Sequence, residues 1–237
     1  MNKFLRRLIS FSFCLVLAFF LTYASVDYLW NSESADNTIF IWGDSQAYQG
    51  LNLKEIQRIT GKRVLSAARH GAGIYDFLVF SQKVPSNSSV IVALSKPVQL
   101  RRKQKDRNWS GLSLNSLLAL YKMNYSLYDI SRIIKNNIMP KKLYVSDVPL
   151  YPYRNIIAMP EPISLFEDGY SKIPDYLDDK QELYRYGIKT LIKKNCKITF
   201  VEFPYHPLVE AIEKKSDVIK NLETFKTTVM ALFKKHT

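Results

Sequence analysis

Three short segments of the chain carry groups suited to acyl transfer, and each follows an apolar run typical of a buried strand. Gly43-Asp44-Ser45 supplies a serine hydroxyl, which is a candidate nucleophile. Gly71 supplies a backbone N–H that can approach a ligand closely and stabilise an oxyanion. His206 supplies an imidazole, the usual general base for a serine. These residue types predict a nucleophile, an oxyanion donor and a base.

Each segment also has a purely structural interpretation. The Gly-Asp-Ser tripeptide is typical of a turn followed by a helix cap. Gly71 is suited to turning the chain into the next helix. His70 is a second candidate base because it lies next to this glycine, although the order of serine early and histidine late favours His206.

Basic side chains near the same segments are candidates for substrate binding. Arg69 precedes the glycine segment and is suited to contact a negatively charged substrate group. The run 101–107 begins with Arg101 and Arg102 and follows the apolar run 89–95. We interpret it either as a solvated loop or as a patch that attracts an acidic glycan or lipid head groups.

Strands and helices alternate along the chain and must position these segments. Apolar runs predict five strands, at residues 38–42, 63–67, 89–95, 142–148 and 197–203. Helical patterns are found at 51–60, 74–84, 112–137 with a break near 124–126, 178–194 and 208–235. The alternation predicts an α/β domain with a mainly parallel, five-stranded sheet. Ligands of such sheets bind outside the carboxyl ends of the strands, where the three segments are expected.

The three segments together resemble the motifs of the SGNH or GDSL-type hydrolases, over the region 38–210. The first segment matches the nucleophile block, and residues 66–71 look like the second block, Asn-x-Gly-x-x-Gly. His206 is similar to the catalytic histidine of this family. The resemblance implies a three-layer, flavodoxin-like α/β fold. It also implies that Ser45 is the nucleophile and that the N–H groups of Ser45 and Gly71 are oxyanion donors.

Two positions depart from the family pattern. Residues 95–99 stand where the family has Gly-x-Asn-Asp, and Gln99 is the candidate replacement for the missing asparagine as third oxyanion donor. Loss of one such donor costs about 2.7–4 kcal/mol of transition-state stabilisation. Phe203 stands where the family has the aspartate of Asp-x-x-His, so either Glu202 or a backbone carbonyl would orient His206.

An uncharged run of 19 residues, 8–26, lies between three basic residues and Asp27. As a helix it nearly spans a hydrocarbon core of about 30 Å, and its positive flank places residues 1–7 in the cytoplasm. A cleavable signal peptide and a buried core helix are the alternatives. We expect a single-pass protein of the cell inner membrane, with the rest of the chain in the periplasm or outside the cell. The predicted organisation is an anchor at 1–30, a linker at 31–37 and an SGNH-like domain at 38–237.

Composition and charge exclude several classes of protein. The chain has 237 residues, of which 34 are basic and 21 acidic, giving a net charge of +13. Apolar residues make up 47%, which is typical of a folded domain rather than a disordered chain. Two cysteines and three histidines without metal-ligand spacing predict no metal site, and we expect no cofactor. Export argues against nucleic acid as the partner of the basic surface.

The resemblance, the export and the basic charge together predict a role at the cell surface. We expect a serine esterase or an O-acyltransferase that acts on acyl esters, in the first place acetyl esters, of an envelope or extracellular polysaccharide. Water as the acceptor gives the esterase, and a sugar hydroxyl gives the acyltransferase. The alternative is a non-catalytic SGNH-like module that binds glycan or partner proteins within a polysaccharide assembly machine.

Overall fold

The computed structural model describes residues 3–69, 72–94, 113–123, 125–139, 141–146, 177–202 and 227. Within these ranges, four strands form one parallel sheet in the order β2-β1-β3-β4. The strands are β1 (Thr38–Trp42), β2 (Arg63–Ser66), β3 (Ser89–Leu94) and β4 (Lys197–Glu202). The α/β class and four of the five predicted strands are thereby confirmed.

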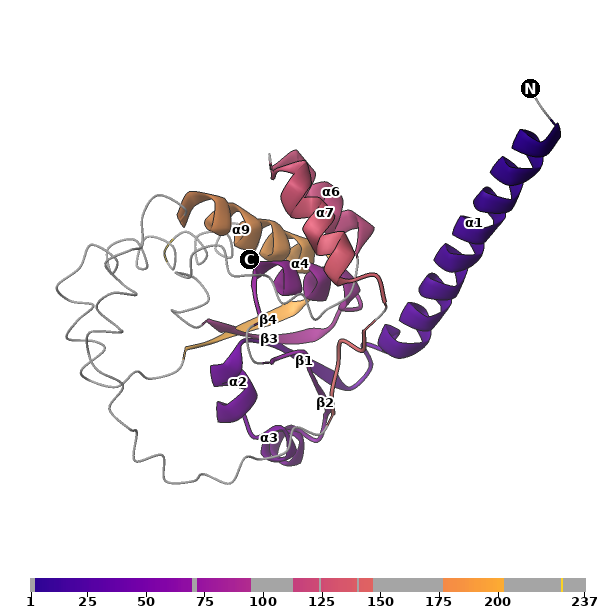
Figure 1. Cartoon of the computed structure of the whole chain (residues 1–237). Coiled ribbons are helices and arrows are strands. Elements are labelled where there is room, and N and C mark those ends of the chain that lie inside the picture. The colour runs from indigo at the N-terminus through magenta and orange to yellow at the C-terminus, as the bar shows by residue number, and fades with distance from the viewer. Residues whose placement is uncertain are drawn as a thin grey trace, which may run out of the picture.

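Helices lie on both sides of this sheet (Figure 1). Helices α2 (Ser45–Gly50) and α3 (Leu53–Thr60) connect β1 to β2 and lie on one side. Helix α4 (Ile74–Lys83) connects β2 to β3 and lies on the other side. The described helices between β3 and β4 share that second side, namely α6 (Leu114–Lys122), α7 (Leu127–Asn136) and α9 (Leu177–Lys193).

Local capping residues explain where several of these helices begin and end. The side chain of Asn52 caps α3 by accepting a backbone N–H at 3.1 Å. Gly61 ends the same helix in the left-handed conformation, with φ of 65°, which glycine adopts without strain. Ser113 and Ser126 cap α6 and α7 in the same way as Asn52. The predicted break in the helical pattern near 124–126 is therefore confirmed.

The larger hydrophobic core lies between the sheet and the helices α4 and α9. Trp42 of β1 packs on Phe77 of α4 with ring centroids 4.7 Å apart, and Phe40 packs on Tyr144 at 5.2 Å. Gly187 allows α9 to approach α4 closely, because a Cβ at this position would lie 2.5 Å from a ring carbon of Phe77. A smaller cluster on the opposite face of the sheet packs against α3 and comprises Ile39, Ile41, Leu53 and Val64.

The predicted strand at 142–148 is wrong over its described part. Val145 makes a single antiparallel bridge with Ser66, through two N–H···O bonds of 2.8 Å. The apolar pattern that suggested a strand instead buries the side chains of Leu143 and Tyr144 in the larger core. A short apolar run can therefore bury its side chains by packing over the edge of β2, without forming a ladder of hydrogen bonds.

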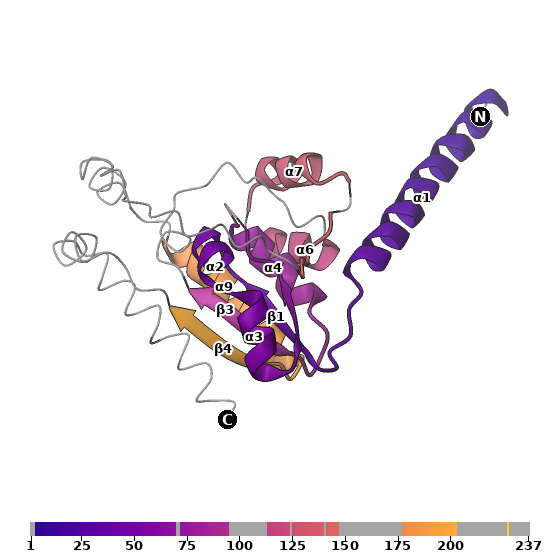
Figure 2. The ribbon, with the colours of Figure 1, turned by 90° about the horizontal axis from the view of Figure 1, so that it is seen from below.

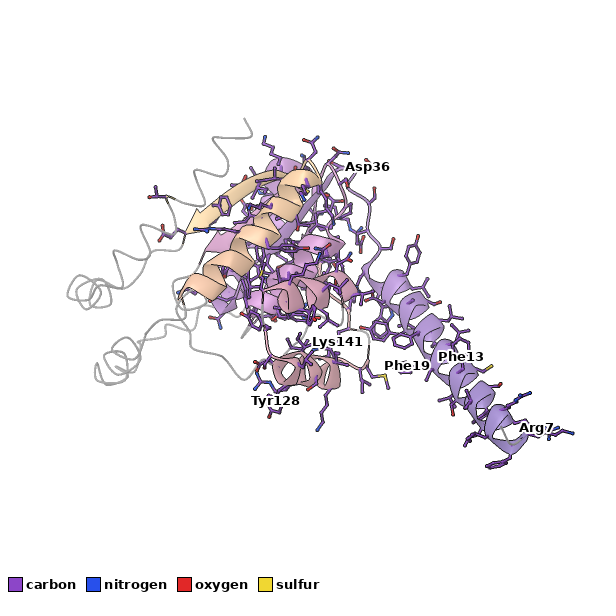
Figure 3. All side chains as sticks on the ribbon, turned by 90° about the horizontal axis from the view of Figure 1, so that it is seen from above. Arg7, Phe13, Phe19, Asp36, Tyr128 and Lys141 are labelled. Atoms are coloured by element: carbon purple, nitrogen blue, oxygen red, sulfur yellow. The ribbon has the colours of Figure 1, made fainter. Side chains whose placement is uncertain are left out.

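Helix α1 (Lys3–Asn31) extends from the globular part as one continuous helix (Figures 1 and 2). It is long and apolar enough to span a membrane. Arg7, Phe13 and Phe19 lie along the part of α1 that leads away from the globular part (Figure 3). None of its most apolar window is buried against the rest of the chain, which is contrary to the alternative of a buried core helix.

Candidate functional site

The segment Gly43-Asp44-Ser45 follows the carboxyl end of β1, in the interior of the sheet. The chain passes from β1 outward to β2 and then crosses to β3 on the other side of β1, so the strand order reverses between β1 and β3. Open α/β sheets bind ligands in the crevice at such a reversal. The arrowheads of β3 and β4 point away from α1, so this edge of the sheet faces away from the apolar helix (Figure 2).

A row of small residues crosses the carboxyl edge at the level of Gly43. A Cβ at this position would lie 2.8 Å from the Cβ of Ala93 on β3, the residue after Val92, which pairs with Trp42. It would lie 2.3 Å from the Cβ of Ala47 on α2. Ala68, beyond the end of β2, completes the same buried cluster. The glycine is therefore required by packing, because any side chain there would push α2 away from the sheet.

Asp44 is the N-cap of α2. Its carboxylate accepts the backbone N–H of Gln46 at 3.0 Å, and its carbonyl accepts the N–H of Tyr48 at 2.9 Å. The side chain is buried, and Ser45 is the first residue of the helix. The Gly-Asp-Ser segment therefore forms a turn and a helix cap, as its structural interpretation predicted. This role does not conflict with a catalytic one, because the same cap places Ser45 at the start of a helix at the carboxyl edge of the sheet.

The end of β2 is hydrogen bonded to the same segment. The N–H of Arg69 donates to the carbonyl of Gly43 at 3.2 Å, and the N–H of Ala67 donates to the carbonyl of Ile41 at 2.8 Å. Parallel pairing therefore continues past the last residue of β2. The candidate oxyanion glycine is only two positions further along the chain than Arg69.

The guanidinium of Arg69 binds backbone carbonyls of the protein. Its Nε donates to Ala67 at 3.4 Å, and one terminal nitrogen donates to the carbonyl of Leu143 at 2.8 Å. Burial lowers the pKa of this guanidinium, and the negative charge of Asp76 acts in the opposite direction. Arg69 thus fastens the segment 141–146 to the end of β2, and the contact with substrate suggested by the sequence stays a prediction.

Asp76 is a residue of this edge that sequence analysis missed. It is buried on the first turn of α4, and its Oδ2 accepts the N–H of Gly73 at 2.8 Å. Burial lowers the pKa of Lys141, and the negative charge of Asp76 acts in the opposite direction. Asp76 lies three positions after Gly73, the N-cap of α4. An acidic residue at this spacing is a capping signal, so the sequence indicates a structural role for Asp76.

Tyr184 of α9 lies beneath the site and was also missed. Its ring packs edge-on against Trp42, the last residue of β1, with centroids 6.0 Å apart. Burial, and secondarily the charge of Asp44, raise the pKa of this phenol well above its ordinary value. The phenol therefore keeps its proton. The indole N–H of Trp42 is buried and has no hydrogen-bond partner in the described part of the chain.

Glu202 ends β4 at the same edge, because it pairs in register with Leu94 at the end of β3. Its side chain is exposed. Only β3 separates β4 from β1, so two strand spacings place their ends about 10 Å apart. The structure describes the backbone of Ser45 but not its side chain. The other predicted site residues lie outside the described ranges, namely His70, Gly71, Gln99, Arg101, Arg102 and His206.

The described part of this edge combines a serine at a helix start, a buried acidic cap and a row of small residues. The first N–H groups of a helix have no partner within it and can stabilise a developing negative charge. Among the described residues, no group of His, Cys, Asp and Glu side chains could hold a metal ion. Comparison of the chain with protein-family models, curated proteins and solved structures found no match.

Proposed function

We propose that the chain is a membrane-anchored, exported serine esterase or O-acyltransferase with an SGNH-type, three-layer fold. Its substrates would be acyl esters, in the first place acetyl esters, of an envelope or extracellular polysaccharide. The observation that carries this proposal is the place of Gly43-Asp44-Ser45, between the end of β1 and the start of α2, where the strand order reverses.

The proposed reaction proceeds through a covalent acyl-enzyme. Ser45 Oγ attacks the acyl carbon while His206 takes its proton, and the N–H groups of Ser45 and Gly71 bind the resulting oxyanion. Collapse of this intermediate breaks the ester bond, and the leaving alcohol receives the proton from His206. Water or a sugar hydroxyl then attacks the acyl-enzyme, which gives either the free acid or a new ester.

The cap geometry supports an oxyanion role for the Ser45 N–H. The Asp44 carboxylate binds the N–H of Gln46 rather than that of Ser45. The tight packing at Gly43 holds this first turn of α2 close to the sheet. Positioning donors rigidly, before charge develops, is what makes such groups effective in catalysis.

Helix α1 and the charge of the chain support the proposed location. Lys3, Arg6 and Arg7 precede its apolar run, so the N-terminus would lie in the cytoplasm and the α/β part outside the inner membrane. Residues 31–237 carry 31 basic against 20 acidic residues, a net charge of +11. A basic exported domain is suited to an acidic glycan or to anionic head groups.

The test is turnover of an aryl acetate by the full-length chain in detergent, together with labelling by a fluorophosphonate. Ser45→Ala should abolish labelling and lower turnover about 10³-fold or more. Ser32→Ala, at an exposed serine outside the site, is the matched control and should leave both unchanged. Retention of the rate in Ser45→Ala would show that this serine is not the nucleophile.

The second candidate is the non-catalytic module that binds glycan. It is favoured by the missing asparagine in residues 95–99 and by Phe203 at the family's aspartate position. Such a protein would resist the fluorophosphonate and show no turnover, yet would bind acetylated polysaccharide. Binding that is unchanged in Ser45→Ala, with no turnover in either protein, would favour this module over the enzyme.

A further inference from the structure

The last turns of α1 are fastened to the globular part by polar contacts. Asp27 forms an ion pair with Lys83 at the end of α4. Asn31 is buried; its amide nitrogen donates to the carbonyl of Lys141 at 3.0 Å, and its Oδ1 accepts the N–H of Leu143 at 2.6 Å. These contacts fix the direction in which α1 leaves the globular part, so α1 and the globular part are connected rigidly.

The attachment lies at the level where a membrane surface would be. The uncharged run ends at Val26, one residue before Asp27, and Asn31 is about 7.5 Å further along the helix. That rise is comparable to the thickness of one headgroup region. Tyr28 and Trp30 are exposed at this end, as is typical of side chains at a membrane interface. The face of the globular part beside α1 would therefore meet the lipid head groups.

Helices α6 and α7 form that face. In Figures 1 and 2 they lie on the side of the globular part toward which α1 extends, and Figure 3 shows Tyr128 of α7 on the side away from the sheet. Large apolar side chains are exposed there: Leu114 and Leu127 are each 72% exposed. We call the exposed large apolar residues of α6, of α7 and of the two positions 138 and 139 the α6–α7 face. It comprises Leu114, Leu118, Tyr121, Leu127, Tyr128, Ile134, Ile138 and Met139.

Basic residues accompany these apolar side chains. The segment 113–142 contains five basic residues and one acidic residue, Asp129, which is hydrogen bonded to Ser126. The lysine side chains at 122, 135 and 142 are exposed. Exposed apolar side chains flanked by lysines are typical of helices that lie in the interface of an anionic bilayer.

We propose that the α6–α7 face binds the surface of the same bilayer that α1 spans. The apolar side chains enter the boundary between head groups and acyl chains, and the lysines contact anionic lipid head groups. This inference rests on the proposed membrane anchorage of α1. The choice of lipid rather than protein follows from the fixed direction of α1, which holds the face at the membrane, and from its positive charge. The carboxyl edge of the sheet is then held away from α1, toward soluble or polymeric substrates.

Single fluorescent labels in the full-length chain, reconstituted in vesicles of phosphatidylcholine and phosphatidylglycerol, test this proposal. Labels are placed at Leu127→Cys, or at Ile59→Cys as the matched control, after Cys14→Ser and Cys196→Ser. Ile59 is 69% exposed on α3, on the other side of the sheet. Lipids with a doxyl quencher near the head group should quench the label at 127 about twofold or more, and the label at 59 little.

A third label separates failure of this proposal from failure of the anchor. Phe13→Cys lies within the apolar run of α1, so its label should be quenched by lipid in every case in which α1 spans the bilayer. Quenching at 13 with none at 127 would overturn the α6–α7 proposal alone. No quenching at 13 would overturn the anchorage and, with it, this proposal. Protection of 127 from both lipid-borne quencher and aqueous acrylamide would show that protein covers the face, which also overturns it.

The lysines are tested by a combined variant, Lys122→Ala, Lys135→Ala and Lys142→Ala. We expect weaker lipid quenching at 127 in anionic vesicles and no change in vesicles of phosphatidylcholine alone. An equal effect in both kinds of vesicle would overturn the role assigned to these lysines.

Discussion

The carboxyl edge of the sheet and the attachment of α1 are held together in different ways. At the carboxyl edge, the absence of a side chain at Gly43 allows α2 to pack against Ala93. At the attachment, Asp27 and Asn31 hold α1 through an ion pair and hydrogen bonds to residues 56 to 112 positions away. Close packing of small groups therefore determines the first region, and polar pairing determines the second.

The largest expected effect comes from adding one methyl group to the carboxyl edge. Gly43→Ala would place a Cβ 2.3 Å from that of Ala47, so α2 must shift, and we expect a loss of about 3 kcal/mol in the free energy of unfolding. Gly73→Ala is the matched control, because its nearest neighbour would be 3.9 Å away, and it should cost about 1 kcal/mol or less. Urea titration in detergent measures both. Equal losses would show that packing at Gly43 is not special.

The next largest effect is expected at the attachment. Asn31→Ala removes the hydrogen bonds that the asparagine side chain makes with the N–H of Leu143 and the carbonyl of Lys141. Because the site is buried, it should lower the free energy of unfolding by about 2 kcal/mol. Ser34→Ala removes only local hydrogen bonds at an exposed position and should change it by less than about 0.5 kcal/mol. If the two variants unfold alike, the buried asparagine does not hold α1.

A smaller effect is expected for the ion pair of the same region. Lys83→Met removes the partner of Asp27 at a site where both side chains are mostly buried. It should lower the free energy of unfolding by about 1 kcal/mol. A double-mutant cycle with Asp27→Asn should give a coupling of similar size. The coupling should persist in high salt, because partly buried pairs are weakly screened. Strict additivity would instead mean that the pair contributes nothing to the attachment.

The smallest effect at neutral pH is expected beneath the carboxyl edge, at Tyr184. Burial and the charge of Asp44 raise the pKa of its phenol above the ordinary value of 10.0, so the folded state keeps a proton that the unfolded state loses. Stability is therefore fully present below pH 10 and decreases as the pH rises above it. Tyr184→Phe should reduce this decrease by about 1.4 kcal/mol per pH unit.

Unfolding between about pH 9 and pH 11, the range in which an ordinary phenol titrates, measures this slope. Burial also raises the pKa of Tyr144, which contributes to the slope in both proteins and so cancels in their difference. Identical slopes for the parent chain and Tyr184→Phe would mean that Tyr184 ionises in the folded state as it does in the unfolded state.

The elements of the fold were largely predictable because their signals are local. β1 is entirely buried, and its sequence is correspondingly apolar throughout, as expected of an interior strand in a parallel sheet. Asn52 and Gly61, the caps of α3, are recognisable from their residue types and positions. The prediction of a strand at 142–148 was wrong over its described part, because burial of Leu143 and Tyr144 produces the same apolar pattern as a strand.

The candidate site was predictable only in part. The Gly-Asp-Ser segment follows a strand in the sequence, so its place at a carboxyl edge follows from the α/β pattern. The substrate contact suggested for Arg69 stays a prediction, and its described bonds go to backbone carbonyls. Tyr184 and Asp76 could not be assigned to this edge, because their contacts depend on how α9 and α4 pack.

The sequence by itself determined the four strands of the sheet, the caps of α3, the apolar length of α1 and the position of Ser45 after a strand, because each depends on neighbours within a few residues. Only the tertiary structure decided that β1 lies between β2 and β3, that Gly43 faces Ala93, and that Asn31 binds the segment 141–143. Those contacts join residues far apart in the chain, and no local pattern encodes which distant surfaces will meet.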